Sequence, residues 1–529
     1  MHFRLIFAIV LQAVSTAAVD TSVDLGYSTY IGTALSNGLT QWLGIRYAAA
    51  PLGDLRFEPP QDPPHETEPK QADVAGPACL EVGGDPDDTS SGEDCLFLNV
   101  MAPSDATSDS ELPVFVFIQG GGFSKNADPN INATGLVEAA DHDLVVVAMQ
   151  YRVGPYGFLT DGNNIKANNG LRDQRKVLEW IQDHIAKFGG DPDHVVIQGA
   201  SAGGASVTFH LTAENGEDKG LFHGAIIQSG SFASMLTIEQ SQYQYDNLTS
   251  RLGCAGSDSL SCLRGKTARE LQEQNFNIPL PGGDNPPLYQ WLPAIDNDFV
   301  TDYTYRAIAE GNYIRVPTIV GDDRNGGTVF APRTLSTLED SNQWIIDQYP
   351  AIKAEQLPII NALYPNPNDS CPSEGCYWRR TANIYQEIRF MCPGIYINQA
   401  MSQDESSWAY LYDVEDPAQV ARGLGVPHTV EVYAIIGPQY SSKAPQSYKT
   451  GGINEYVTPV MQGYWTSFTR SLDPNRYRAD GTAEWESWND EPEKRMVIGT
   501  GGTTEMEDVD SDLKKRCEFW INHGLSMSL

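Results

Sequence analysis

Short apolar runs alternate along the chain with longer stretches in which apolar residues recur every three or four positions. The short runs are rich in β-branched residues, as buried strands are, and the longer stretches have helical spacing. We expect strands at residues 24–33, 39–47, 93–100, 113–119, 144–150, 195–197, 224–228, 316–321 and 408–414. Because strands that alternate with helices form parallel sheets with crossover connections, the pattern predicts an α/β fold with a central, mainly parallel β-sheet flanked by helices.

The stretches at residues 236–293 and 335–388 have little strand pattern. We expect them to form a largely helical insertion above the carboxyl ends of the strands. Ligand sites of open α/β sheets lie at this edge, so the insertion would cover the functional site.

One turn between a strand and a helix has a distinctive sequence. Residues 199–203 read Gly-Ala-Ser-Ala-Gly; they follow the apolar run 195–197 and precede residues 205–210, which can form a helix. A Gly-X-Ser-X-Gly turn in this context is a nucleophile elbow, in which glycines permit close backbone contacts and the serine hydroxyl is exposed. Ser201 is therefore the candidate nucleophile.

A serine hydroxyl is a poor nucleophile near neutral pH, so it needs a base, a carboxylate that orients the base, and donors for the oxyanion. Residues 119–123, Gln-Gly-Gly-Gly-Phe, follow a predicted buried strand, as a glycine-rich oxyanion loop does. We predict that the backbone amides of Gly121, Gly122 and Ala202 form the oxyanion hole.

The base is one of nine histidines. In α/β hydrolases the base follows the nucleophile and the acid in the sequence, and only His428 and His523 lie in the last third of the chain. His523 is close to the C-terminus, whereas His428 lies in a predicted loop after the strand at 408–414.

The N-terminal segment has the features of a secretory signal peptide. His2 and Arg4 precede an apolar core at residues 5–14 and small residues at 15–18, so we expect a signal peptide at 1–18 and one domain at 19–529. No other apolar run is long enough to cross a bilayer, and the C-terminus lacks a hydrophobic tail for a lipid anchor. We predict a secreted, extracellular protein without a membrane anchor. Its sequons at Asn132, Asn247 and Asn368 are either glycosylated or plain loop asparagines.

The formal net charge of −34 bears on the partners of the chain. Such a charge repels nucleic acid and anionic membranes, and the sequence has no basic patch to oppose it. We expect no nucleic-acid partner, and we attribute the charge to solubility.

Ordered motifs along the chain resemble the type-B carboxylesterase family, which includes cholinesterases and a group of secreted fungal lipases. The matching segments are residues 44–47, 56–57, 93–96, 151–154, 169–174, 188–192, 199–203, 228–231 and 428–431. The resemblance implies the α/β-hydrolase fold, with Ser201 as the acylated nucleophile, His428 as the general base and Ser229 as a neighbour of the triad. The acyl-enzyme mechanism needs no metal or organic cofactor, and the expected partner is a small-molecule ester.

The chain has eight cysteines, which suggest disulfides in an exported protein. Number alone leaves their connectivity open. The resemblance pairs Cys79 with Cys95, Cys254 with Cys262, and Cys392 with Cys517, which leaves Cys371 for Cys376.

The acid position of the family is where this sequence departs from the pattern. The family usually has a glutamate, sometimes an aspartate, in a G-x-x-x-x-E-G segment, and the corresponding residue here is Gly326. Loss of the triad acid in serine proteases lowers turnover by about 10⁴. Either a neighbour substitutes, with Asp323 the nearest candidate and Asp322 the next, or the enzyme is slow, or its esterase activity has faded. Glu431 resembles a structural acid of the family and is not assigned to the triad.

A non-catalytic secreted binding protein is the competing hypothesis, because the family includes adhesion members that keep the fold and have lost triad residues. Those members typically lose the serine. This chain keeps Ser201, His428 and the glycine loop, which favours a serine carboxylesterase. The reactivity of Ser201 discriminates between the two.

The loop between the first cysteine pair bears on the substrate. In the family it carries a cholinesterase's cation-binding tryptophan or a lipase's amphipathic lid. Here residues 80–94 are acidic, contain no aromatic residue, and offer only Leu80 and Val82 as large apolar side chains. Without a ring for a cation–π contact or an apolar face for lipid, the loop favours soluble or modest-sized esters over choline esters and emulsified triglycerides.

Overall fold

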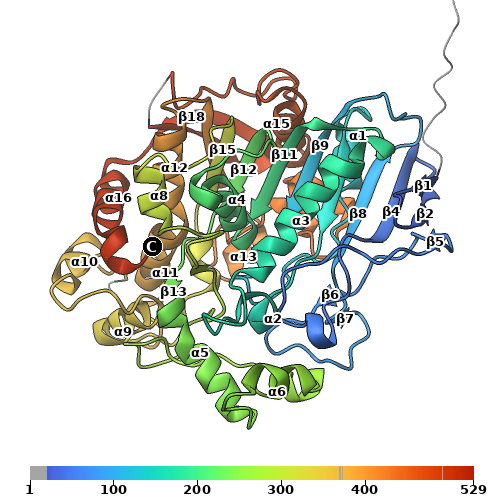
Figure 1. The fold of residues 1–529 in the computed structure, drawn as a ribbon. Helices are drawn as coiled ribbons and strands as arrows, with labels where there is room; N and C mark the ends of the chain where they lie inside the picture. The colour runs from blue at the N-terminus through green and yellow to red at the C-terminus, as the bar shows by residue number, and fades with distance from the viewer. Residues whose placement is uncertain (1–20, 369–370, 372, 491–492) are drawn as a thin grey trace, which may run out of the picture.

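The computed structural model describes residues 21–368, 371, 373–490 and 493–529; the expected signal peptide at 1–18 lies outside them. An 11-stranded sheet forms the centre, with the order β18-β17-β16-β15-β12-β11-β9-β10-β8-β4-β3 (Figure 1). Neighbouring strands from β17 to β10 are parallel, and β18 at one edge and β8, β4 and β3 at the other are antiparallel. The α/β prediction is therefore confirmed. The strands are β3 (Thr33–Ala34), β4 (Leu39–Arg46), β8 (Phe97–Pro103), β9 (Leu112–Ile118), β10 (Val145–Met149), β11 (Gly190–Ala200), β12 (Gly224–Gln228), β15 (Thr318–Asp323), β16 (Ser407–Asp413), β17 (Lys494–Gly499) and β18 (Thr503–Asp508).

Alternate side chains of β9 enter two separate cores, one on each face of the sheet. Val114, Val116 and Ile118 belong to one core, and Phe115 and Phe117 belong to the other. The first core includes residues of α3 (Asn169–His184), α4 (Ala202–Thr212), α12 (Cys392–Met401) and α16 (Ser511–Gly524). The second includes residues of α1 (Thr134–Ala139), α14 (Val432–Ile436) and α15 (Val457–Ser471). Because both faces are covered, the strand is apolar at every buried position.

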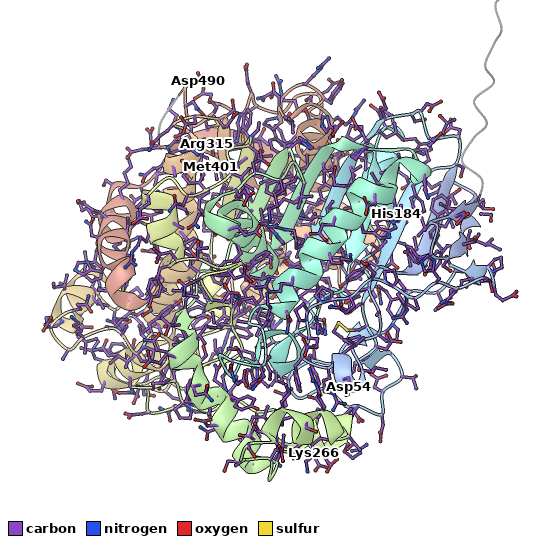
Figure 2. The ribbon with its side chains drawn as sticks, in the orientation of Figure 1. Asp54, His184, Lys266, Arg315, Met401 and Asp490 are labelled. Atoms are coloured by element: carbon purple, nitrogen blue, oxygen red, sulfur yellow. A yellow bond between two sulfur atoms is a disulfide. The ribbon has the colours of Figure 1, made fainter. Side chains whose placement is uncertain are left out.

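The insertion predicted above the sheet is helical in part. Its helices are α5 (Ile238–Arg251), α6 (Ser259–Gly265), α7 (Ala268–Glu273), α9 (Leu338–Gln348), α10 (Leu357–Leu363) and α11 (Trp378–Gln386). In Figure 1, α5 and α6 lie at the bottom of the view and α9 and α10 at the lower left. In Figure 2, the labelled Lys266 marks the loop after α6, and His184 marks the end of α3 on the sheet. The helical prediction is wrong for residues 274–293, all of which are described and none of which is helical. Five prolines in this stretch remove backbone donors that a helix needs.

One strand prediction needs correction, and one hairpin lies where no strands were expected. The stretch 24–33 is not one strand: β1 (Ser22–Asp24) and β2 (Thr29–Ile31) pair with each other and with β5 (Lys70–Gln71) in a small separate sheet. The turn between them contains Gly26 at a φ of +86°. The hairpin of β17 and β18 was not predicted, because β18 reads Thr-Thr-Glu-Met-Glu-Asp and has a single apolar residue.

Four disulfides link Cys79 to Cys95, Cys254 to Cys262, Cys371 to Cys376 and Cys392 to Cys517, the same pairs that the resemblance implies. The last closes a loop of 125 residues and joins α12 to α16. It therefore fixes the C-terminal helix to a helix that packs on the sheet.

Candidate active site

The turn after β11 has the backbone of a nucleophile elbow. β11 ends at Ala200, α4 begins at Ala202, and Ser201 between them has φ of +60° and ψ of −119°. This conformation is rare for a residue with a side chain and costs about 1–3 kcal/mol, so it persists only where the surrounding structure imposes it. The partly exposed Ser201 thus lies on the strained strand-to-helix turn that the sequence predicts.

The two glycines of the motif are required by close backbone contacts. A Cβ at Gly199 would lie 2.1 Å from the carbonyl carbon of Gly203. A Cβ at Gly203 would lie 2.0 Å from the carbonyl oxygen of Ile118, at the end of β9. Neither position can hold a side chain, so the turn is locked between the neighbouring strand and its own helix.

The glycine loop that follows β9 packs against this turn. A Cβ at Gly120 would lie 3.0 Å from the Cβ of Ser201. Gly121 and Gly122 have φ of +122° and +62°. Within the described part of the chain, no acceptor bonds the amide of either residue, and the amide of Ala202 at the start of α4 has no acceptor within the helix. The three amides predicted to form the oxyanion hole are therefore free donors on segments that meet at Ser201.

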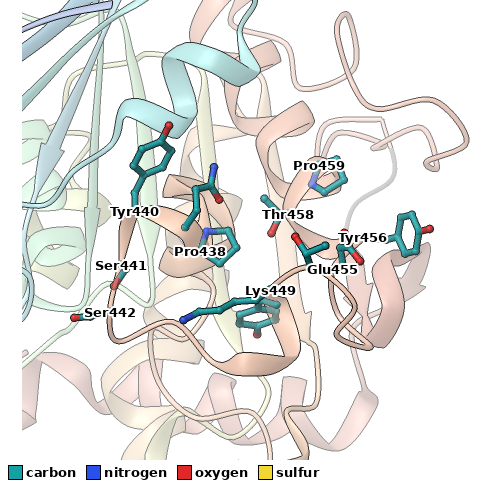
Figure 3. Close-up of a pocket in the computed structure, with 12 residues that line it drawn as sticks. Pro438, Tyr440, Ser441, Ser442, Lys449, Glu455, Tyr456, Thr458 and Pro459 are labelled. Atoms are coloured by element: carbon teal, nitrogen blue, oxygen red, sulfur yellow. The ribbon is translucent and has the colours of Figure 1, made fainter. Parts of the chain in front are cut away.

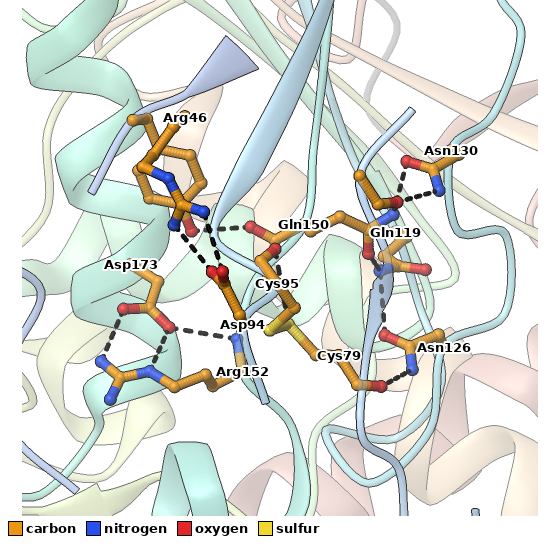
Figure 4. The surroundings of a disulfide bond; sticks show 12 residues. Arg46, Cys79, Asp94, Cys95, Gln119, Asn126, Asn130, Gln150, Arg152 and Asp173 are labelled. Carbon is orange, nitrogen blue, oxygen red and sulfur yellow. Dashed lines mark hydrogen bonds and ion pairs between the residues drawn. A yellow bond between two sulfur atoms is a disulfide. The ribbon is translucent and has the colours of Figure 1, made fainter. Parts of the chain in front are cut away.

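A buried network of side-chain amides anchors the glycine loop (Figure 4). The Nε2 of Gln119 donates to the Oε1 of Gln150 at 2.8 Å and to the Oδ1 of Asn126 at 3.1 Å. The Nδ2 of Asn126 in turn donates to the carbonyl of Cys79 at 2.7 Å. The loop is thereby anchored to the Cys79–Cys95 disulfide by side-chain amides, which leaves its own backbone donors free.

His428 lies between α13 (Pro417–Ala421) and α14, enclosed by aromatic rings. Its ring stacks on Phe390 with centroids 4.4 Å apart, and Phe330 contacts it edge-on at 5.1 Å. Both ring nitrogens are buried, and neither has a hydrogen-bond partner in the described structure. Burial and, to a lesser extent, the Arg389 guanidinium lower the pKa of His428 to about 3. The imidazole is thus neutral near pH 7, but no hydrogen bond fixes its tautomer.

Gly326, which the sequence places at the expected acid position, faces this ring. Gly326 begins a short helical turn, Gly326–Val329, after β15. A Cβ at Gly326 would lie 3.7 Å from the Nδ1 of His428, an ordinary van der Waals distance. Gly326 is not among the residues with positive φ, so a side chain at this position is sterically permitted. Gly326 itself therefore offers no carboxylate to Nδ1.

Asp323, the acid candidate from the sequence, contacts the backbone next to His428 rather than its ring. Its Oδ2 accepts from the amide of Thr429 at 2.6 Å and from the Oγ of Ser229 at 3.3 Å. Ser229 is thus joined to the His428 loop through this carboxyl, whereas no hydrogen bond joins Asp323 to the imidazole.

Asp323 also adjoins the buried carboxyl of Glu431, whose Oε1 accepts from Gln228 and Tyr410. Burial raises the pKa of both carboxyls, and the charge of Glu431 and the hydrogen bond to it raise the pKa of Asp323 further. The raised pKa values of these two adjoining carboxyls indicate that they share a proton. Because Asp323 also forms no hydrogen bond with the imidazole, the geometry gives no support to its assignment as the triad acid.

Asp322, the next candidate, faces the other side of the sheet. Its Oδ2 lies 3.1 Å from the position of a Cβ at Gly394, in α12. Burial raises its pKa to about 7, against the opposing charge of Arg495. Successive side chains of a strand point to opposite faces, so Asp322 and Asp323 cannot both reach His428.

The segment 228–231 joins the elbow to the His428 loop. The amide of Ser201 donates to the carbonyl of Gln228 at 2.9 Å, and the amide of Ser231 donates to the carbonyl of Ser201 at 3.2 Å. Between these two contacts, Ser229 binds the carboxyl that holds the backbone after His428. The Oγ of Ser201 forms no hydrogen bond with His428 in the described structure; catalytic hydrogen bonds often form only in the substrate complex.

A cavity of about 820 Å³ lies elsewhere, between the loop after α14 and the start of α15 (Figure 3). Its lining includes Pro438, Tyr440, Lys449, Tyr456 and Pro459. None of the predicted catalytic residues lines it, so we do not assign it to the reaction.

The sequence is matched by a protein-family model described as the carboxylesterase family, over residues 20–520. The chain belongs to the carboxylesterase family. The resemblance drawn from its motifs is therefore confirmed, and the chain is a hydrolase of the family that includes lipases and carboxylesterases.

Individual relatives of this carboxylesterase cover most of its length. Secreted lipase 4 of Gibberella zeae is 28% identical over 94% of this chain and 92% of its own. Lipase 4 of Diutina rugosa is 31% identical over 88% of this chain and 89% of its own. The crystal structure of Aspergillus niger EstA is 38% identical and superposes with a TM-score of 0.92, covering 97% of this chain and 99% of EstA.

Sequence reasoning missed two residues beside the reacting groups. Arg389 and Phe390 lie in a π-helical segment, Glu387–Met391, between α11 and α12. Such segments occur frequently at functional sites. The only signal in the sequence is a single arginine within the apolar run 388–391.

The remaining sequence predictions concern modification, membranes and metals. Asn247 is exposed on α5, and Asn132 and Asn368 are half-buried; glycosylation of the three stays a prediction. Across the described residues, no helix is sufficiently long and apolar to span a membrane, and no group of three or more His, Cys, Asp or Glu side chains is arranged to hold a metal ion.

Proposed function

We propose that this carboxylesterase hydrolyses esters through an acyl-enzyme, with Ser201 as the nucleophile and His428 as the general base. The observation that carries the proposal is the elbow itself. Ser201 is strained, its flanking glycines cannot be replaced, and the unbonded amides of the glycine loop lie on the adjoining segment. Strain of this kind is maintained at functional sites, where it positions a reacting group.

In this mechanism the two ring nitrogens of His428 face different residues, Gly326 and Ser201. Because Nδ1 faces Gly326, Nε2 is the atom that takes the proton from the Oγ of Ser201. The Oγ attacks the ester carbonyl, and the amides of Gly121, Gly122 and Ala202 stabilise the oxyanion. The Nε2 proton passes to the departing alcohol, and water then cleaves the acyl-enzyme by the same two proton transfers.

Turnover is slow because no carboxylate supports the protonated imidazole. Gly326 supplies none, and the carboxyl of Asp323 forms no hydrogen bond with the imidazole. The imidazolium that forms in each step is disfavoured by its buried surroundings and by the charge of Arg389, and no carboxylate offsets these effects. Serine catalysis persists without a triad acid at a rate about 10⁴ lower.

The substrates are soluble esters of modest size, and the protein acts outside the cell. Leu80 is buried and Val82 packs against the core, so the loop closed by Cys79 and Cys95 offers no exposed apolar face for lipid. Four disulfides and relatives named secreted lipases support an extracellular location.

The test is hydrolysis of 4-nitrophenyl butyrate by the purified protein and by Ser201→Ala, with Ser257→Ala as a control at a serine outside the site. Turnover that only Ser201→Ala abolishes supports the proposal. Equal turnover in all three proteins means that the hydrolysis does not use this serine. No turnover in any of them, with no labelling of Ser201 by a fluorophosphonate, makes a non-catalytic binding protein the better description.

A further inference from the structure

Arg389 is a buried guanidinium that has no carboxylate partner among the described residues. Arg389 as a whole residue is 5% exposed. The Nε donates to the Oγ of Ser231 at 2.7 Å, and the Tyr349 hydroxyl lies close to the guanidinium. One terminal nitrogen, Nη2, is buried and has no hydrogen-bond partner in the described structure. The titratable groups close to Arg389 are Tyr385, Tyr349, Tyr289 and the neutral His428, and none of them is an acid that ionises near neutral pH.

Most other buried arginines of the described chain bind a carboxylate: Arg175 pairs with Glu214 and Arg495 with Glu507, although the Nε of Arg175 has no partner. The less buried Arg251 has no partner for its nitrogens and stacks on Phe276 instead. Arg152 donates two hydrogen bonds to the carboxylate of Asp173, and Arg56 does the same with Glu93. Arg380 has no carboxylate partner either, but each of its three nitrogens donates a hydrogen bond. A buried charge is normally compensated in one of these ways, because an uncompensated charge is costly away from water.

Arg389 lies close to the nucleophile turn, the oxyanion loop and the His428 ring. Its partner Ser231 donates a backbone hydrogen bond to the carbonyl of Ser201. Its guanidinium lies 5.6 Å from the ring centroid of Tyr289, and that ring is 2.3 Å from the position of a Cβ at Gly122, in the oxyanion loop. The next residue in the chain, Phe390, stacks on the ring of His428.

We propose that Arg389 is a specificity-determining residue that binds a carboxylate of the substrate, so that the preferred esters carry a negative charge on one of their two halves. This rests on the proposed function. Nη2 supplies a charge-assisted hydrogen bond to the substrate carboxylate, which completes the bonding of the guanidinium when substrate is bound. The net charge of −34 repels anions at long range, so the preference is a property of the site and not of the whole surface.

The test compares matched esters that differ in one charge. For the acyl half, mono-4-nitrophenyl adipate is compared with methyl 4-nitrophenyl adipate. For the alcohol half, 4-carboxyphenyl hexanoate is compared with its methyl benzoate ester. Each kcat/KM is divided by the uncatalysed rate of the same ester, so that intrinsic reactivity cancels. The proteins are wild type, Arg389→Met, Arg389→Lys and, as a control at an exposed arginine on α8 (Thr304–Ala309), Arg306→Met.

Wild type should prefer the anionic ester in one of the two pairs by about tenfold or more, the range of a hydrogen bond to a charged group. Arg389→Met should abolish the preference, Arg389→Lys should retain part of it, and Arg306→Met should leave it unchanged. A wild type that hydrolyses the neutral esters without preferring either anionic ester overturns the inference and leaves the proposed function standing. If Arg389→Met lowers kcat/KM equally for the anionic and the neutral ester of a pair, the inference is also overturned, because equal losses indicate a structural role.

A second measurement does not depend on turnover or on the folding of a variant. Adipate should slow the labelling of Ser201 by a fluorophosphonate in wild type, and the neutral adipamide should not. Equal effects of the two compounds contradict a carboxylate site. If no ester is hydrolysed and Ser201 is not labelled at all, the proposed function fails, and the inference fails with it.

Discussion

Restoring a carboxylate at residue 326 should accelerate the enzyme. A Cβ at Gly326 would lie 3.7 Å from the Nδ1 of His428 and would meet no closer atom. The Cβ of Gly326→Glu is therefore accommodated without a clash, and it lies next to the imidazole. The backbone there does not need glycine, because its φ is not positive. The carboxylate would accept the Nδ1 proton, fix the tautomer and stabilise the imidazolium.

The size of the gain is bounded by the effect of removing such an acid. A loss of about 10⁴ in kcat corresponds to about 5.5 kcal/mol of transition-state stabilisation. An acid installed without surroundings adapted to it should recover part of this, so we expect kcat to rise between about 10-fold and 10³-fold. The carboxylate should also raise the pKa of His428 from its value of about 3, which moves the acidic limb of kcat/KM to higher pH.

The assay is the pH dependence of 4-nitrophenyl butyrate hydrolysis, with Gly326→Gln as the uncharged control of equal length. Gly326→Asp tests whether a shorter side chain reaches Nδ1. Near-UV circular dichroism and urea unfolding establish that each variant is folded. A folded Gly326→Glu with unchanged kcat and an unchanged acidic limb would refute the reasoning, because it would mean that another group already supports His428.

Three further predictions follow from the buried groups, and one from a disulfide. Asp323→Asn keeps an acceptor and a donor for the present partners, so kcat should stay within about threefold of wild type, whereas loss of a triad acid would lower it by about 10⁴. Because the pKa of His428 is about 3, kcat/KM should lose activity at acid pH only near pH 3; a limb at pH 6 to 7 would show a solvated base. The pKa of Asp322, raised to about 7, makes the folded state bind a proton that the unfolded state releases near pH 4, so stability falls as pH rises between these values. Asp322→Asn should then raise the free energy of urea unfolding by up to about 4 kcal/mol at pH 8 and little at pH 4. Replacing Cys392 and Cys517 by serine should lower that free energy by about 2–5 kcal/mol, since the bridge closes a loop of 125 residues.

The parts of the fold that the sequence predicts are those specified by local pattern. The run 195–197 is β-branched and the following turn contains two glycines, so strand, elbow and helix could be placed before the structure was known. The stretch 236–293 is predicted to be largely helical, although the prolines of residues 274–293 argue against a helix there. β18 was missed because its exposed face and edge position leave it one apolar residue.

The candidate site was predictable where a motif fixes it and not where distant segments meet. Nothing near Asp323 in the sequence indicates that Glu431, more than one hundred residues later, shares its proton. Arg389 and Phe390 likewise reach the site only through the packing of a π-helical segment against the elbow and the His428 loop. By contrast, the alternation of side chains along a strand is sufficient to predict that Asp322 and Asp323 point to opposite faces of the sheet.

The central claim is that Ser201 becomes covalently acylated, and peptide mass spectrometry after treatment with a fluorophosphonate tests it most directly. We predict a single adduct on the peptide that contains Ser201 in wild type, and no adduct on the corresponding peptide of Ser201→Ala. An adduct on another serine, or an unmodified Ser201 in a folded protein, would contradict the account.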